Sequence, residues 1–171
     1  MENKENKSIS RRKFIGNVTA ATAGFTILPS YVISGFGYKM PSDKLNIAGI
    51  GVGGVGATNV HNCAGENIIA LCDVDWDYAA ETFSKYPNAK AYKDYRKMFD
   101  ELGKSIDAVI VATPDHTHAI ITAASIRMGK HVYTQKPLTH TVYESRLLKN
   151  LAREYKVATQ MGNQGNSGEG I

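Results

Sequence analysis

A glycine-rich turn, followed by an acidic residue 22 positions after its first glycine, is the pattern with the clearest chemistry in this chain. Gly51, Gly53 and Gly56 give the spacing G-x-G-x-x-G directly after an apolar run. The first glycine permits a tight turn, the second lets a pyrophosphate approach the backbone, and the third lets a helix pack close to a strand. Asp73 ends a second apolar run, at a spacing where a carboxylate accepts from a ribose hydroxyl. The flanking runs and the acid favour a dinucleotide site over a merely flexible glycine loop.

A second polar segment follows the most apolar run of the chain, residues 108–112. Thr113 and Pro114 shape a turn, and Asp115 is placed to cap the helix that we expect to follow. His116 and His118 lie two positions apart at the start of this helix, so they point to different faces. The sequence shows no further ligand cluster, so we expect no metal site and assign the segment to capping and to facing a cofactor.

Two more polar groups follow the later apolar runs. The ammonium of Lys136 could stabilise a developing alkoxide or shuttle a proton, although an ordinary surface lysine fits the spacing equally well. Asn163 and Gln164 are suited to binding amides and hydroxyls, although glycine-rich loops often carry such residues without a function. Because ligands bind at the carboxyl ends of parallel strands, we expect these groups to lie at the same edge as the glycine turn.

Strand-like and helix-like segments alternate along the chain, which implies right-handed βαβ units. We therefore predict an α/β fold with a doubly wound, Rossmann-like parallel sheet in the order 3-2-1-4-5-6. Thr141 and Glu144 have the spacing of a capping box. The predicted strands are 45–51, 68–73, 89–92, 108–112, 131–134 and 157–161, and the predicted helices are 54–63, 76–86 (entered through Asp75), 95–102, 115–128 and 141–155.

The first forty residues differ in composition from the rest. Residues 1–40 hold six Lys or Arg and two Asp or Glu, whereas residues 41–171 hold fourteen of each, so the net charge of +4 belongs to this leader. Nothing in that balance argues for a nucleic-acid partner. Arg11 and Arg12, followed by a modest apolar run, predict a twin-arginine-type signal and export to the periplasm or cell envelope. An amphipathic anchor or an uncleaved membrane tail is the alternative, and we expect no integral membrane span in the mature form.

The two cysteines have neither metal-binding nor redox spacing. Cys72 lies in a predicted buried strand and Cys63 near a helix end, so we expect both to be small core residues. A disulfide between them stays open for an exported protein.

Residues 44–171 together resemble the N-terminal domain of the Gfo/Idh/MocA family of oxidoreductases. The resemblance implies that residues 41–165 form the dinucleotide-binding domain and that 166–171 begin the connection to a C-terminal α+β substrate domain, which is missing from this chain. It also implies a homo-oligomer that assembles through that missing domain. The matching segments are Gly51-Val52-Gly53-Gly54-Val55-Gly56, Cys72-Asp73-Val74-Asp75, Ala112-Thr113-Pro114-Asp115-His116-Thr117-His118, Lys136-Pro137-Leu138 and Met161-Gly162-Asn163-Gln164-Gly165.

The resemblance also assigns roles to individual residues. Asp73 would hold the adenosine ribose, and Lys136 would lie beside the nicotinamide and the substrate as the catalytic group. Two positions depart from the family, since Gln135 stands where Glu is usual and Asn166 stands where several relatives have His. The implied cofactor-binding set is Gly51, Val52, Gly53, Gly54, Val55, Asp73, Thr113, Pro114, His118, Gln135, Lys136, Asn163 and Gln164.

The function expected from this resemblance is hydride transfer between a nicotinamide cofactor and a hydroxyl-bearing carbon of a sugar or polyol. Acidic residues and no Lys or Arg directly follow Asp73, which favours NAD over NADP. We expect a small-molecule sugar or polyol as the partner, and this fragment alone to be inactive. The alternatives are an NAD-dependent glycosidase that uses transient oxidation and elimination, and a nucleotide-binding fragment without turnover.

Overall fold

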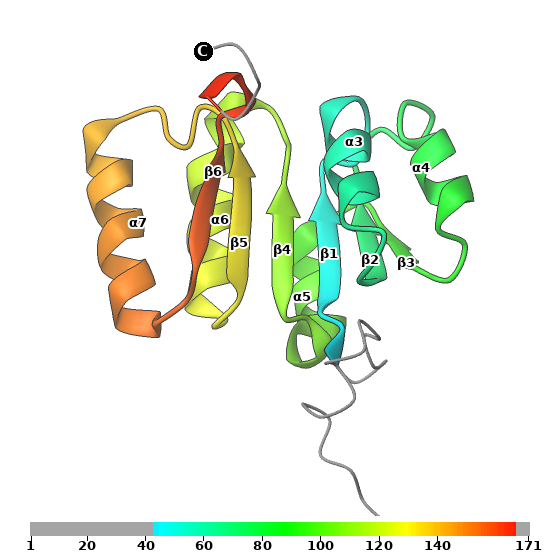
Figure 1. Cartoon of the computed structure of the whole chain (residues 1–171), viewed down its shortest axis with the longest axis horizontal. Helices are drawn as coiled ribbons and strands as arrows, with labels where there is room; N and C mark the ends of the chain where they lie inside the picture. Colours follow the sequence, from blue (N-terminus) through cyan, green and yellow to red (C-terminus); the bar gives the residue numbers. More distant parts are fainter. Residues whose placement is uncertain (1–42, 167–171) are drawn as a thin grey trace, which may run out of the picture. The chain divides into compact units, whose positions relative to one another are not determined.

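A computed structural model describes residues 43–166, so the predicted leader at 1–40 and residues 167–171 lie outside the described part. Six strands form one sheet in the order β3-β2-β1-β4-β5-β6, and every neighbouring pair is parallel (Figure 1). The predicted Rossmann-like order is therefore confirmed. The strands are β1 (Asn46–Ile50), β2 (Asn67–Cys72), β3 (Lys90–Tyr92), β4 (Ala108–Val111), β5 (His131–Gln135) and β6 (Thr159–Gly162).

Helices cover both faces of the sheet, and each face has its own apolar core. One core contains side chains from α3 and α4, and the other contains side chains from α5, α6 and α7. This division agrees with right-handed crossovers that run in one direction from β1 to β3 and in the other from β3 to β6. The helices are α3 (Val55–Asn62), α4 (Ala80–Lys85), α5 (Tyr95–Leu102), α6 (His118–Arg127) and α7 (Val142–Tyr155).

The central strands supply both cores because successive side chains of a strand point to opposite faces. On β4, Val109 and Val111 belong to the core under α5, α6 and α7, whereas Ile110 belongs to the core under α3 and α4. All three side chains are at most 4% exposed, and burying one such side chain contributes roughly 1.5–3 kcal/mol. A strand buried on both faces needs the continuous apolar run that this segment has.

The capping box predicted for α7 is present. Thr141 Oγ1 accepts from the Glu144 N–H at 3.2 Å, and the Glu144 carboxylate accepts from the N–H groups of Thr141 and His140 at 2.9 and 2.8 Å. These backbone hydrogen bonds lower the pKa of Glu144 below its ordinary value of 4.5. The cap fixes the start of α7 directly after the segment that contains Lys136.

Two helix starts differ from the sequence prediction. The helix expected at 76–86 begins only at Ala80, because the Asp75 carboxylate accepts from the Tyr78 N–H at 3.0 Å and residues 76–79 form turns. The prediction that Asp115 caps the following helix was wrong. Asp115 lies inside a 3-10 helix, Asp115–Thr117, and α6 starts after it at His118 without a side-chain cap.

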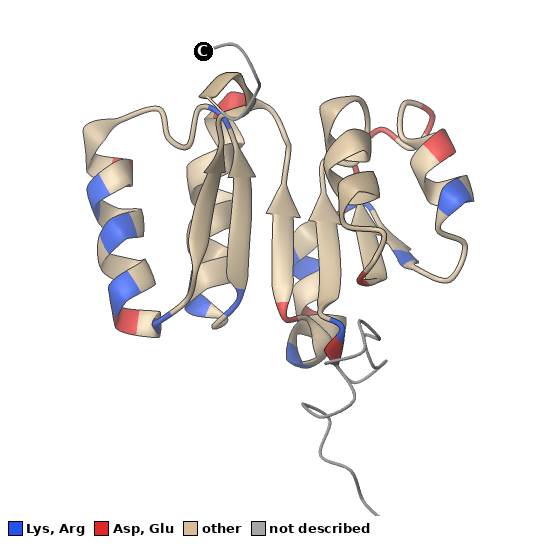
Figure 2. Ribbon diagram, viewed as in Figure 1, with Lys and Arg blue, Asp and Glu red and all other residues tan. Residues whose placement is uncertain are grey.

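The Lys, Arg, Asp and Glu positions lie mainly on the helices and in the connecting segments (Figure 2), and none of these residues within 43–166 is buried. On α7, Arg146, Lys149 and Arg153 are exposed at helical spacing, as expected for a solvated helix face. Along residues 43–166, no helix combines the length and the apolar character needed to cross a bilayer.

Candidate functional site

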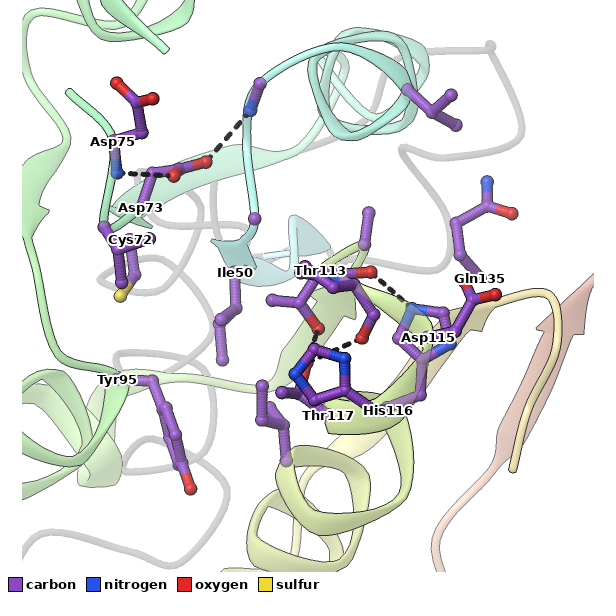
Figure 3. A pocket seen from close by; sticks show the side chains of 18 of the residues that line it. Ile50, Cys72, Asp73, Asp75, Tyr95, Thr113, Asp115, His116, Thr117 and Gln135 are labelled. Atoms are coloured by element: carbon purple, nitrogen blue, oxygen red, sulfur yellow. Dashed lines mark hydrogen bonds between the residues drawn. The ribbon is translucent and has the colours of Figure 1, made fainter. Parts of the chain in front are cut away.

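A cleft of about 810 Å³ lies where the carboxyl ends of the strands meet the following turns (Figure 3). Residues after β1, β2, β3, β4 and β5 line it, which is where an open parallel sheet binds its ligands. The structure thus brings the glycine turn and Lys136 to one cleft. The predicted site residues that line it are Gly51, Gly53, Val55, Asp73, Thr113, Pro114, His118, Gln135 and Lys136.

Four predicted site residues do not line the cleft. Val52 is fully buried beneath the turn, and Gly54 is the residue that precedes α3. Asn163 and Gln164 follow β6, outside the cleft-lining set, and Gln164 Nε2 donates to the Tyr133 hydroxyl at 3.3 Å.

The glycine turn requires its glycines for local reasons. Gly51 has φ of 76°, and a Cβ there would lie 2.7 Å from the backbone of Ala112 after β4. A Cβ on Gly56 would overlap the carbonyl oxygen of Gly51 itself. The first glycine therefore permits the turn, and the third lets α3 start directly against it, as the spacing predicts.

Tyr78 covers the middle of this turn. A Cβ on Gly53 would overlap the Tyr78 ring, and a Cβ on Gly54 would overlap its hydroxyl. Tyr78 is 68% exposed, and its N–H is held by Asp75. The sequence reasoning did not select Tyr78, because the contact joins a turn after β2 to a turn after β1.

Asp73 ties the end of β2 to the glycine turn. Its Oδ2 accepts from the N–H groups of Val52 and Gly53 at 2.8 and 3.1 Å, and its Oδ1 accepts from the Asp75 N–H at 3.0 Å. These bonds satisfy backbone donors at the rim of the cleft and hold the carboxylate where the spacing places a ribose.

A group of four residues after β3 joins Asp73 at the same end of the cleft, and the sequence analysis missed it. Two of them are cations that already have neighbours. Lys93 Nζ lies 5.3 Å from the centre of the Trp76 ring, and Arg96 Nη1 lies 3.3 Å from Asp94 Oδ1. The predicted strand order could have identified these residues, because it places the end of β3 beside the end of β2. The four residues are Lys93, Asp94, Tyr95 and Arg96.

The turns after β4 and β5 meet at the opposite end of the cleft. His118 is 1% exposed, and its ring nitrogens lie 2.7 Å from the carbonyl oxygens of Thr113 and Pro137. Gln135 is buried, and its Oε1 accepts from the Lys136 N–H at 3.1 Å. Its Nε2 has no hydrogen-bond partner within residues 43–166. The side chain of Lys136 is exposed at this end of the cleft.

The two cysteines differ in how far they are buried. Burial, together with the charges of Asp73 and Asp94, raises the pKa of Cys72 to about 12, so its thiol stays protonated on the cleft wall. Cys63 is half-buried, and neither cysteine is in a disulfide.

His116 is exposed whereas His118 is buried, as expected for two positions on different faces. No cluster of three or more metal-ligating side chains occurs in the described part of the chain.

These features suit an extended anionic ligand with ribose groups. The N-cap of α3, Gly54, makes no side-chain capping hydrogen bond, so the positive end of this helix is suited to phosphate oxygens, although the Gly56 N–H already donates to the Gly53 carbonyl at 3.0 Å. Asp73 adds an acceptor on one side, and Lys136 adds a cation at the far end. The volume lies within the usual range of about 300–1,000 Å³ for small-molecule sites.

Comparison with known families matches residues 45–163 to the Gfo/Idh/MocA family, described as an oxidoreductase family with an NAD-binding Rossmann fold. An inositol 2-dehydrogenase from Salmonella typhimurium is 27% identical over 119 residues, which is 66% of this chain and 35% of that protein. Glycosyl hydrolase family 109 protein 1 from Akkermansia muciniphila is 31% identical over 121 residues, covering 63% of this chain and 25% of that protein. The chain thus spans about a third or less of these relatives' length.

A solved structure of similar fold is myo-inositol 2-dehydrogenase from Lactobacillus plantarum, with a TM-score of 0.66 and 21% identity. The similarity covers 74% of this chain and 38% of that one. At this level of identity, the likeness supports the fold alone.

Proposed function

The chain belongs to the Gfo/Idh/MocA family of oxidoreductases, and from that premise we propose that it binds NAD for the oxidation of a sugar or polyol. The observation that carries this proposal is the single cleft that joins the glycine turn and Asp73 to Lys136. When bound, NAD accepts a hydride from the carbon that bears the substrate hydroxyl. The inositol dehydrogenase among the relatives supports a polyhydroxylated substrate.

Different residues along the cleft bind different parts of the cofactor and the substrate. The N–H groups at the start of α3 hold phosphate, and the Asp73 carboxylate accepts from the adenosine ribose. Lys136 lies at the end where Thr113 and Gln135 converge. As a base takes the hydroxyl proton of the substrate, the ammonium of Lys136 stabilises the negative charge that develops on the substrate oxygen, which is an electrostatic contribution.

NAD rather than NADP is the cofactor that Asp73 favours. Its carboxylate is held between Val52, Gly53 and Asp75, where a second anion such as a 2′-phosphate would be repelled. Lys93 and Arg96, which line the same cleft after β3, are the cations that could oppose this preference. Titrating the protein with both nucleotides, in the wild type and in Lys93→Ala/Arg96→Ala, tests it. We expect NAD to bind more tightly in both proteins, and tighter NADP binding to the wild type would contradict the assignment.

The direct test of the site is NAD binding by Asp73→Ala and Asp73→Asn, measured by calorimetry. We expect at least about tenfold weaker binding, since a hydrogen bond to a charged group contributes roughly 1.5–3 kcal/mol. Asp100→Asn, an exposed acid on α5, is the matched control. Unchanged affinity in folded Asp73→Asn would refute the assignment.

The role of Lys136 needs a turnover measurement on the complete enzyme. We expect Lys136→Met to lower the rate of hydride transfer by about 100-fold or more, in the range for removing one group that stabilises a developing anion, with NAD affinity changed by less than about threefold. Equal turnover in Lys136→Met and wild type would make Lys136 an ordinary surface lysine.

Hydrolysis of a glycoside is a second candidate, favoured by the similarity to a family 109 glycosyl hydrolase. Such an enzyme would oxidise the sugar transiently, eliminate the aglycone and return the hydride, so NAD would be regenerated in each cycle. Release of a chromogenic aglycone without net NADH would select this candidate. Stoichiometric NADH with a free polyol would select the dehydrogenase, and neither reaction would leave a nucleotide-binding module.

A further inference from the structure

The space above the middle of the glycine turn is filled by a side chain rather than by backbone. A Cβ added to Gly53 would overlap Cδ1 and Cε1 of the Tyr78 ring, and a Cβ added to Gly54 would overlap the Tyr78 hydroxyl. At the first and third glycines of the motif, Gly51 and Gly56, the nearest obstructing atoms belong to the backbone. Backbone in a packed turn cannot yield, whereas a side chain can rotate, so the cover over the middle of the turn is the one that can be removed.

This space is the one that a dinucleotide needs. The second glycine of the spacing G-x-G-x-x-G lets a pyrophosphate approach the backbone, and in this chain it is Gly53. A position without room for a methyl group has no room for a phosphate group. The Tyr78 ring, where the structure places it, and a pyrophosphate bound over Gly53 therefore exclude each other.

The backbone that carries Tyr78 is held from two sides. The Tyr78 N–H donates to Asp75 Oδ1 at 3.0 Å, and the Asp75 N–H donates to Asp73 Oδ1 at 3.0 Å (Figure 3). The next residue, Ala79, is 1% exposed, and its N–H donates to the Asp75 carbonyl oxygen at 3.1 Å. Moving this turn away from the glycines would break several of these hydrogen bonds.

The side chain of Tyr78, by contrast, has little that holds it. It is 68% exposed, and its hydroxyl makes no hydrogen bond to another residue of the described range 43–166. Exposed side chains exchange rotamers within picoseconds to nanoseconds. Rotation about the side-chain bonds would therefore uncover Gly53 while the backbone of Tyr78 keeps its hydrogen bond to Asp75.

We propose that Tyr78 is a movable cover of the pyrophosphate position, with its ring on Gly53 when no nucleotide is bound and rotated away when one is. The nucleotide then binds only to the molecules whose ring is away, so the cover lowers the apparent affinity by that fraction. Tyr78 thus sets the affinity for phosphate-bearing ligands without binding them. The position of the ring stands on its own geometry, and only the identity of the displacing ligand, NAD, rests on the proposed function.

The position of the ring is tested by nuclear Overhauser effects in the 171-residue chain. We expect cross-peaks between the Tyr78 ring protons and the Hα protons of Gly53 without nucleotide, and their loss when NAD is added to saturation. Adenosine, which carries a ribose but no phosphate, should leave the cross-peaks in place. Cross-peaks that are absent without nucleotide, that persist with NAD or that disappear with adenosine would each overturn the proposal.

The effect on affinity is tested by calorimetry with Tyr78→Ala, which removes the ring. We expect this variant to bind NAD about three- to tenfold more tightly than the wild type, as follows if the ring covers Gly53 in roughly 70–90% of the molecules. Tyr78→Phe keeps the ring and should therefore bind NAD at least about threefold more weakly than Tyr78→Ala. Tyr143→Ala, at a 75% exposed tyrosine on α7 outside the cleft, is the matched control and should bind NAD as the wild type does.

Failure of the cover and failure of the proposed function give different results. Equal or weaker NAD binding by Tyr78→Ala, with binding by the wild type intact, would overturn the cover alone, because the ring would then be neutral or would contact the bound nucleotide. Absence of NAD binding in both Tyr78→Ala and the wild type would refute the proposed function and the displacement together.

Discussion

The glycine turn after β1 presents backbone to the cleft, whereas hydrogen bonds from the buried side chain of His118 hold the turns after β4 and β5 together. At the first end, Gly51 and Gly56 let two pieces of chain approach closely, and one carboxylate, Asp73, accepts from the N–H groups of Val52 and Gly53. At the second end, His118 joins two carbonyls, and buried Thr122 and Thr134 share a hydrogen bond of 2.7 Å. The first end thus depends on the absence of side chains, and the second end depends on hydrogen bonds that side chains make.

The largest loss of stability is expected when a side chain is added to the glycine turn after β1. In Gly56→Ala the new Cβ would overlap the Gly51 carbonyl oxygen, and backbone cannot yield as a flexible side chain can. We expect a loss of about 3 kcal/mol in the free energy of unfolding, the upper range for overpacking. Gly65→Ala is the control because nothing lies within 4 Å of its Cβ, and it should be neutral or slightly stabilising. Denaturant unfolding measures both variants, and equal stability would show that the turn adapts.

The second end should respond to single and paired changes differently. Thr122 and Thr134 are each 1% exposed, so Thr134→Val leaves the Thr122 hydroxyl buried without its partner. We expect a loss of about 2 kcal/mol, within the range for an unsatisfied buried hydroxyl. The double variant Thr122→Val/Thr134→Val removes both polar groups and should recover most of that loss. Additive losses in the double-mutant cycle would mean that the two hydroxyls do not act as a pair.

A smaller effect with a distinct pH dependence is expected where α7 begins. The N–H groups of His140 and Thr141 lower the pKa of Glu144 in the folded protein. The carboxylate therefore stabilises the fold above its ordinary value of 4.5, and this stabilisation is lost as pH falls through the lower folded value. Glu144→Gln should melt at a slightly lower temperature than the wild type at neutral pH, and the two should converge in acid. A difference that persists in acid would assign the effect to packing.

The smallest effect on stability is expected at Lys136. Its side chain is exposed, so Lys136→Met should change the free energy of unfolding by less than about 0.5 kcal/mol. Lys136, the residue with the largest proposed effect on turnover, would then have the smallest effect on stability, in contrast to the glycine turn. Thermal unfolding of the two proteins provides the measurement, and a clear loss would indicate a structural role.

Much of this fold follows from local signals. The glycine spacing, the alternation of apolar runs with helical segments and the Thr141–Glu144 box each lie within one stretch of chain, and each predicted its element. The start of α4 was missed because the Asp75 carboxylate stabilises a turn just before it, which apolar periodicity does not reveal.

The candidate site was less accessible to sequence reasoning, because its contacts join segments that are far apart in the chain. Lys93 and Arg96 reach the cleft only through the position of β3 beside β2. The ring of His118 is hydrogen-bonded to carbonyls five residues before it and 19 residues after it in the chain. A pattern of residue types does not encode such pairings, so the predicted site contains Asn163 and Gln164, which do not line the cleft, and omits Tyr78, which does.

The common direction of the six strands also has a practical consequence for work with this protein. Since all the carboxyl ends lie at one rim of the sheet, the turn at Ala64 and Gly65, which leads from α3 into the amino end of β2, lies at the opposite rim. Gly65 is exposed and has open space around it. A cysteine or peptide tag placed there would anchor the domain to an electrode or sensor chip with the cleft facing the solution.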